Sequence, residues 1–191
     1  MDTAKKLSKR IYFVKYLALL GISCLFVSCA TVKEIPQNEH THFIENIPFY
    51  PQDKFQCGPA ALAMVLRYWG INVSPDDIAR EIFSETARGT LDIDMLLFAQ
   101  KKKLNAVQYN GSIDDLEKNI ESGHPVIVLV DYGFSLYKRH HYMVVHGYNE
   151  QGLIVNSGRN KNKFIFQEDF LKIWGKTAYW TLLITPEKSK Q

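Results

Sequence analysis

Residues 52–70 read QDKFQCGPAALAMVLRYWG, and the interpretation of the whole chain begins with this stretch. After Gly58 and Pro59, small and aliphatic residues recur at helical spacing, and proline is well tolerated in the first turn of a helix. Gly70 supplies an end, because glycine readily adopts the left-handed conformation that terminates helices. The stretch therefore predicts a buried helix that begins next to Cys57.

Cys57 would lie where unpaired backbone N–H groups and the helix dipole favour negative charge. Such a position lowers the pKa of a thiol and increases its thiolate fraction at neutral pH. Gly58 allows a close approach of backbone behind the thiol. We predict a reactive thiol, and the alternative is a buried, inert cysteine that packs as a small apolar side chain.

The first residues of the chain have the pattern of an export signal. A cluster of Lys and Arg precedes an apolar run at 16–27, and Ser28 and Cys29 follow. This end resembles the lipobox of bacterial lipoproteins, in which the signal is cut before a cysteine whose thiol is acylated. The resemblance implies lipidation of Cys29. Because Ala30 and not Asp follows, it also implies an exported, outer-membrane lipoprotein that faces the periplasm or the cell surface. A retained signal anchor is the alternative.

We therefore divide the chain into a signal peptide at 1–28, a tether at 29–45, a domain at 46–185 and a tail at 186–191. The chain has three cysteines, and only Cys57 remains in the predicted domain, without a disulfide partner. The net charge of +3 comes from 23 basic and 20 acidic residues, and the basic excess lies in the signal. No basic field remains, so a nucleic-acid partner is not expected.

Within the predicted domain, helix patterns come first and strand patterns second. Ser74 and Ser112 are expected to cap two helices, and Thr90 to cap the helix DIDMLLFAQKKK between them. Short apolar runs then predict strands at 125–131, 141–148, 153–156 and 178–184. Helices followed by an antiparallel sheet predict an α+β domain.

Two segments resemble the bacteriocin-processing, double-glycine cysteine peptidases, which have a papain-like fold. The first is residues 52–70, in which a Gln precedes a Cys-Gly pair that opens a helix of small apolar residues. The second is residues 141–152, HYMVVHGYNEQG, which is similar to the histidine strand and the turn of that family. The resemblance implies a papain-like fold with N-terminal helices packed on a C-terminal antiparallel sheet.

The resemblance also implies a role for each matching residue. Cys57 would attack a carbonyl carbon, His141 would take and return the proton, and Gln52 would donate a hydrogen bond to the oxyanion. The family has an Asp after the histidine hairpin that orients the imidazole, whereas this chain has Asn156 and Ser157 there. Neighbouring strand residues point to opposite faces, so one of these two is expected to orient His141.

Other histidines offer a weaker alternative. His140 and His146 are expected on the strand face opposite His141, and a metal set would combine these three with Asp131. No helical pair of histidines and no paired-cysteine spacing favours such a set, so we expect no metal and no cofactor.

The predicted function is hydrolysis of peptide bonds in exported peptides or proteins, through a thioester on Cys57 with His141 as general base. One alternative is an amide or acyl transferase that uses the same residues. Another is a non-catalytic, peptide-binding lipoprotein of the same fold, which the missing Asp favours. The expected partners are a peptide or protein substrate and, through a lipid, the membrane.

Overall fold

The structure, a computed structural model, describes residues 41–52, 56–87 and 89–187. The predicted signal peptide, Cys29 and the first part of the tether lie outside these residues. No helix within the described ranges is both long enough and apolar enough to cross a membrane.

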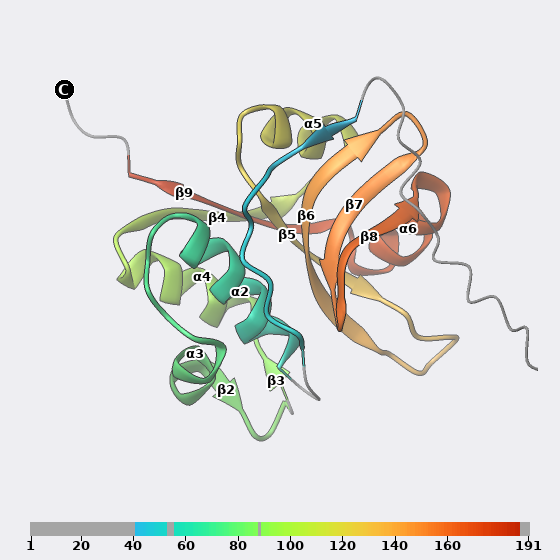
Figure 1. Ribbon diagram of the computed structural model, residues 1–191. Coiled ribbons are helices and arrows are strands. Elements are labelled where there is room, and N and C mark those ends of the chain that lie inside the picture. Colours follow the sequence, from blue (N-terminus) through green and yellow to red (C-terminus); the bar gives the residue numbers. More distant parts are fainter. Residues whose placement is uncertain (1–40, 53–55, 88, 188–191) are drawn as a thin grey trace, which may run out of the picture. The chain divides into compact units, whose positions relative to one another are not determined.

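Short helices alternate with strands along the first half of the chain, and strands dominate the second half (Figure 1). In chain order the elements are β1 (His42–Phe43), α2 (Cys57–Tyr68), α3 (Pro75–Ile82), β2 (Phe83–Ser84), β3 (Gly89–Thr90), α4 (Asp92–Lys101), β4 (Leu104–Asn110), α5 (Ile113–Glu121), β5 (Val126–Asp131), β6 (His140–Asn149), β7 (Gly152–Ser157), β8 (Asn160–Phe166), α6 (Gln167–Trp174), the 3₁₀ helix η2 (Gly175–Thr177) and β9 (Trp180–Pro186).

Seven strands form one antiparallel sheet. Its order is β4-β9-β5-β6-β7-β8, and β1 pairs with β6. The helix α2 packs against β6 and β5, whereas α6 packs against β5, β7 and β8 (Figure 1). The predicted α+β fold, with helices packed on an antiparallel sheet, is therefore confirmed.

The helix α2 is the centre of the core. Its residues from Gly58 to Leu66 are all buried, and Arg67 is the first residue after this run. A helix that is apolar on every side has no stable place at a surface. Alanines at three positions keep the helix narrow and have the highest helix propensity. Gly70 ends this segment with a φ of 84°, as its position after the apolar run predicted.

Gly58 allows a close contact at the start of α2. A Cβ atom at this position would lie 2.8 Å from Cβ of Thr90, which belongs to β3. Real Cβ atoms do not approach so closely, so any side chain here would push the two segments apart. The contact brings the segment that contains Thr90 and Leu91 beside the N-terminus of α2.

Two of the three predicted helix caps are confirmed. The Ser74 hydroxyl accepts a hydrogen bond from the Asp77 backbone N–H at 3.1 Å, and Ser112 accepts one from Asp115 at 3.1 Å. The prediction for Thr90 is wrong, because Leu91 holds the cap position of α4 and Thr90 pairs with Phe83 in β3. The backbone of Thr90 therefore belongs to a strand, and the helix α4 begins two residues later, at Asp92.

Several elements did not stand out in the sequence. The strands β4 and β8 and the helix α6 were not predicted, and the last strand begins at Trp180 because Ala178 and Tyr179 have φ values of 52° and 59°. His42 and Phe43, which we placed in the tether, pair with Tyr148 and Gly147 of β6. Ordered structure therefore begins before Asn46.

We expect Gly58→Ala to lower the free energy of unfolding by about 1–3 kcal/mol, because the added methyl group overlaps Thr90. Urea denaturation of the full chain would measure this change. Gly89→Ala is the matched control, since a Cβ there meets only the Ala87 carbonyl oxygen, at 3.9 Å, and should change stability by less than about 0.5 kcal/mol. Equal effects of the two substitutions would contradict the close contact.

Candidate active site

A groove of ≈ 790 Å³ lies at the N-terminus of α2 and contains the predicted reactive residues. Gln52, Cys57 and His141 all line it. Its lining includes Thr90 and Leu91 from the segment that contacts Gly58, Tyr137 and Arg139 from the loop between β5 and β6, and His140 at the start of β6. The groove is partly open to solvent, and its volume is in the range of sites that bind ligands.

Cys57 is the first residue of α2 and is partly buried at the bottom of the groove. Burial raises the pKa of its thiol, and the backbone N–H groups of Tyr142, Gly58 and Cys57 itself oppose this rise only in part. The expectation of a lowered thiol pKa is therefore wrong. The helix terminus does face the sulfur, but the removal of water has the larger effect.

His141 lies near the start of β6 and faces Ser157, the last residue of β7. Its Nε2 atom is 3.0 Å from the Ser157 hydroxyl oxygen. Because Ser157 engages Nε2, the other ring nitrogen, Nδ1, is the one left for the thiol. Burial, followed by the positive charges of Lys163 and Arg139, lowers the pKa of His141 to about 4.

Asn156 lies on the other face of β7. Its Oδ1 atom accepts a hydrogen bond from the backbone N–H of Asn162 at 3.0 Å, and its side chain interacts with buried His146. Burial lowers the pKa of His146 to about 4. The structure thus brings Ser157, and not Asn156, to His141, and it keeps His146 apart from the groove.

Gln52 is fixed in the groove by three contacts with the sheet. Its backbone N–H donates to the Gly158 carbonyl at 2.9 Å, and its Oε1 accepts from the Gly158 N–H at 2.8 Å. Its Nε2 atom lies 3.4 Å from the carbonyl oxygen of Tyr142. Since the bond from Gly158 identifies the amide oxygen, the amide nitrogen is the end directed toward β6. One of its two N–H groups can then serve a ligand in the groove.

Tyr132 is a neighbour of the site that the sequence did not indicate. Its ring centroid is 5.9 Å from that of His141, and its hydroxyl forms a hydrogen bond with Ser157. The guanidinium of Arg139 lies 5.3 Å from the same ring. Only the pairing of β5 with β6 brings Tyr132 near His141, so no local pattern could have found it.

Asp131 does not belong to the site, although it was a candidate metal ligand. Its carboxylate accepts hydrogen bonds from the backbone N–H groups of Gly133 and Arg139, at 2.7 and 2.8 Å. Within the described residues, no group of three potential ligands is arranged to hold a metal ion. The carboxylate organises the loop between β5 and β6.

The two reactive groups are both uncharged near neutral pH. The raised thiol pKa keeps Cys57 protonated, and the lowered imidazole pKa keeps His141 able to accept a proton. Such a pair can transfer the thiol proton during attack on a carbonyl, without a preformed ion pair. A cysteine at a helix N-terminus and a histidine on an adjacent antiparallel strand define the papain-like class.

Comparison with known proteins identifies the family within this class. Residues 44–181 match the Peptidase C39-like family, and the chain belongs to it. The pediocin PA-1 transport/processing ATP-binding protein PedD of Pediococcus acidilactici is 32% identical to this chain over 136 residues. That match covers 70% of this chain and 18% of PedD, so this chain corresponds to a small part of the relative's length.

Two solved structures have the same fold. A C39-like peptidase from Bacillus anthracis superimposes with a TM-score of 0.65 at 19% identity, over 79% of this chain and all of that one. The peptidase domain of Streptococcus ComA, a bifunctional ABC transporter involved in quorum sensing, gives 0.62 at 25% identity, over 74% of this chain and 100% of that one. The papain-like, C39-type fold predicted from the sequence is therefore confirmed.

The low pKa of His141 leads to a test that needs no substrate. Histidine-ring NMR of the full chain should show His141 titrating with a pKa of about 4, against about 6.5 for a free histidine. Lys163→Gln should raise this pKa and leave that of His146 unchanged. Lys161→Gln is the matched control, because Lys161 acts on His146.

The same shifts give a pH dependence of stability. The unfolded chain binds protons at these histidines below about pH 6.5, whereas the folded chain does so only near pH 4. The free energy of unfolding should therefore fall as the pH drops through this window. If the pKa of His141 stays near 6.5 and does not change in Lys163→Gln, the imidazole is neither buried nor close to Lys163 as described.

Proposed function

We propose that this protein is a cysteine peptidase that hydrolyses peptide bonds in exported peptides or proteins. The observation that supports this function most directly is the contact of His141 with Ser157 in the groove that also contains Cys57. A neutral hydroxyl holds Nε2, so Nδ1 remains as the ring nitrogen that can accept the thiol proton. A binding module has no need for an imidazole oriented beside a cysteine.

The reaction begins with the neutral pair. As Sγ of Cys57 forms a bond to the carbonyl carbon, its proton moves to Nδ1 of His141, and the carbonyl oxygen becomes an oxyanion. The amide of Gln52 and the backbone N–H of Cys57 donate hydrogen bonds to this oxygen. Protonated His141 then delivers the proton to the leaving amine, and a thioester remains on Cys57. Water attacks this thioester while His141 takes its proton, the C–S bond breaks to release the carboxylic acid, and the imidazolium returns the proton to Sγ.

Ser157 takes the place of the Asp that is usual in the family. A hydroxyl accepts the N–H of the imidazole without adding a negative charge, so it fixes the ring but stabilises the imidazolium less than a carboxylate does. We infer that the site depends on the geometry of the groove and the oxyanion donors more than on ion pairing. The low pKa of His141 agrees with this inference.

Activity should depend on all three residues. Using the full chain and a library of quenched fluorescent peptides, we expect Cys57→Ala and His141→Ala to abolish cleavage. Gln52→Ala should lower kcat by about 10²–10³, because it removes one oxyanion donor. Gln108→Ala is the control, since Gln108 is exposed on β4.

The products distinguish the alternatives. Mass spectrometry of the wild-type reaction should detect an acyl adduct on Cys57 and products that form with water alone. Product formation only after an amine is added would instead identify a transferase. Retention of peptides without an adduct or a product would leave a peptide-binding protein and contradict the proposed reaction.

We also propose that the chain is an exported lipoprotein acylated at Cys29. The basic start, the apolar run at 16–27 and the Ser28-Cys29 pair support this proposal. Palmitate labelling in a bacterial host should modify the wild type and Cys57→Ser equally and should disappear in Cys29→Ser. Labelling that survives Cys29→Ser would contradict lipidation at this residue.

A further inference from the structure

The loop between β5 and β6 exposes three large apolar side chains. Phe134, Leu136 and Tyr137 are 87%, 96% and 72% exposed, whereas the next most exposed large apolar side chain that the structure describes, Leu97, reaches 53%. Exposed apolar groups that cluster at one point of a surface indicate a site of contact with another molecule. The three side chains lie within four residues at the tip of a hairpin.

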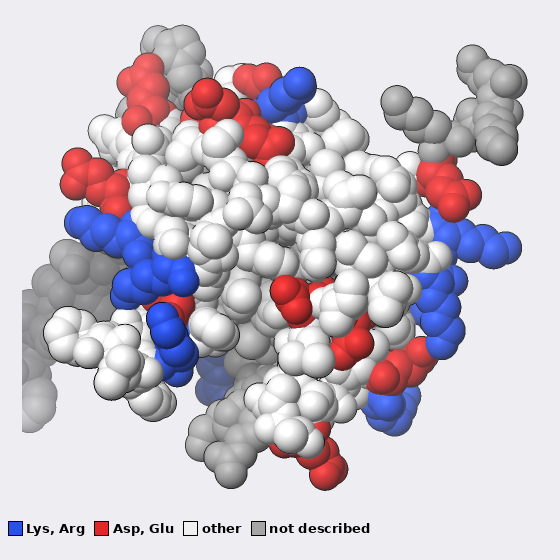
Figure 2. All heavy atoms as spheres, turned by 180° about the vertical axis from the view of Figure 1, so that it is seen from behind, with Lys and Arg blue, Asp and Glu red and all other residues white. Residues whose placement is uncertain are grey.

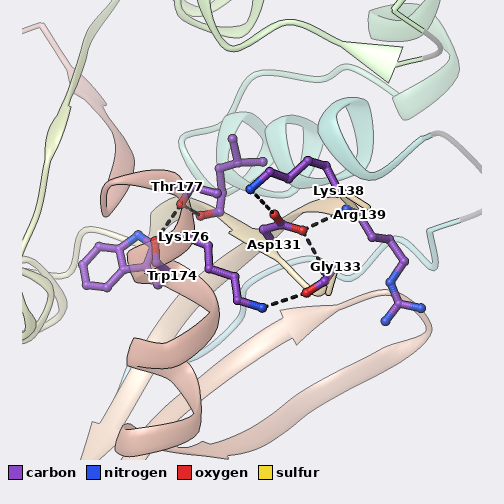
Figure 3. Close-up of polar contacts among 8 residues, drawn as sticks. Asp131, Gly133, Lys138, Arg139, Trp174, Lys176 and Thr177 are labelled. Carbon is purple, nitrogen blue, oxygen red and sulfur yellow. Dashed lines mark hydrogen bonds and ion pairs between the residues drawn. The ribbon is translucent and has the colours of Figure 1, made fainter. Parts of the chain in front are cut away.

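Hydrogen bonds and an ion pair hold the base of this hairpin together (Figure 3). Asp131 is 1% exposed and accepts hydrogen bonds from the backbone N–H groups of Gly133 and Arg139, while Lys138 approaches its carboxylate at 3.4 Å. Lys176 of η2 donates a hydrogen bond to the Gly133 carbonyl at 2.8 Å. Burial alone would raise the pKa of Asp131, but these donors hold it below its usual value, so the carboxylate stays ionised.

The tip has a defined shape of its own. The backbone N–H of Tyr137 donates to the carbonyl of Phe134 at 3.1 Å, and Ser135 between them has a φ of 54°. The hairpin therefore presents its apolar side chains in a preformed turn. A preformed contact avoids much of the entropy cost of ordering a loop on binding.

Positive charge gathers at the base of the hairpin. Residues 132–149 contain no Asp or Glu, and Lys138, Arg139 and Lys176 lie at the base of the hairpin (Figure 3). Each ammonium has three N–H donors, of which the contacts above use one, so others remain for an anion. Elsewhere, on the face in Figure 2, acidic and basic side chains lie together near the margins of a broad uncharged area.

We propose that the hairpin formed by residues 132–139 inserts its tip into the surface of an anionic lipid bilayer. Aromatic and aliphatic side chains partition into the interfacial region of a bilayer, and nearby cations bind the headgroup phosphates. A bilayer suits this tip better than a peptide does, because the side chains project outward and only Tyr137 lines the groove.

This contact would place the mouth of the groove at the membrane surface, because Tyr137, Arg139 and His140 line the groove. Substrates would then be cleaved where they emerge from, or lie on, the bilayer. The inference requires neither peptide hydrolysis nor acylation of Cys29, since it rests on the exposure, hydrogen bonding and charge of the hairpin.

Tryptophan fluorescence of the full chain can test the insertion of the hairpin itself. Phe134→Trp would be compared with Val107→Trp, which adds the same reporter at an exposed position of β4, after subtraction of the wild-type spectrum. With vesicles of phosphatidylcholine and phosphatidylglycerol, we expect a blue shift and quenching by brominated acyl chains for Phe134→Trp only. Lys138→Gln, added to Phe134→Trp, should lower the affinity of the protein for these vesicles about fivefold. One lysine near an anionic surface contributes about that factor to binding.

Two outcomes would overturn the proposal. The first is a tryptophan at position 134 that keeps its emission in buffer when vesicles are added, whether or not the rest of the chain binds them. The second is a blue shift that appears with peptides alone and not with vesicles, which would make the hairpin a peptide contact. Neither outcome affects the cleavage assay, so the two proposals fail separately.

Discussion

The packing of α2 against β6 is the interaction on which the site depends. Since Gly58–Leu66 are buried throughout, the helix has one position in the core, and its first residue is held against the backbone of Tyr142 in β6. The cost of exposing so much apolar surface keeps Cys57 and His141 in one groove, although 84 residues separate them in the sequence. Gln52 then ties the chain before the helix to the turn after β7.

The elements with a strong local pattern could be predicted from the sequence. The apolar run of α2, the caps at Ser74 and Ser112 and the apolar strands β5 to β7 each carry their own signal. The polar strand β8, the mixed strand β4 and the two-residue β1 do not, because pairing fixes their place. The strands β1 and β4 pair with strands far along the chain, and β8 pairs with the preceding β7. Thr90 was assigned to the wrong element for the same reason.

The sequence placed Gln52, Cys57 and His141 in one groove, but it did not reveal the electrostatics there. The family resemblance offered Asn156 and Ser157 as partners of His141, and strand alternation allowed only one of them. The register of β6 and β7 decides between the two. The thiol pKa was predicted in the wrong direction, because a sequence reveals a helix terminus but not the depth of burial around it. Tyr132 was missed because its proximity to His141 is created by β5 and β6 together.

The unbroken pairing of β6 with β5, from His140 to Val145, also limits how the chain can vary in length. The strand is hydrogen-bonded to β5 and to β7, and its two faces serve different surroundings, His141 in the groove and His146 in the interior. Inserting or deleting one residue within β6 would turn either His141 or His146 to the other side of the sheet. Natural insertions should therefore accumulate in the hairpin ahead of β6 or in the turn after it, and the ten residues of β6 should keep a constant length among relatives.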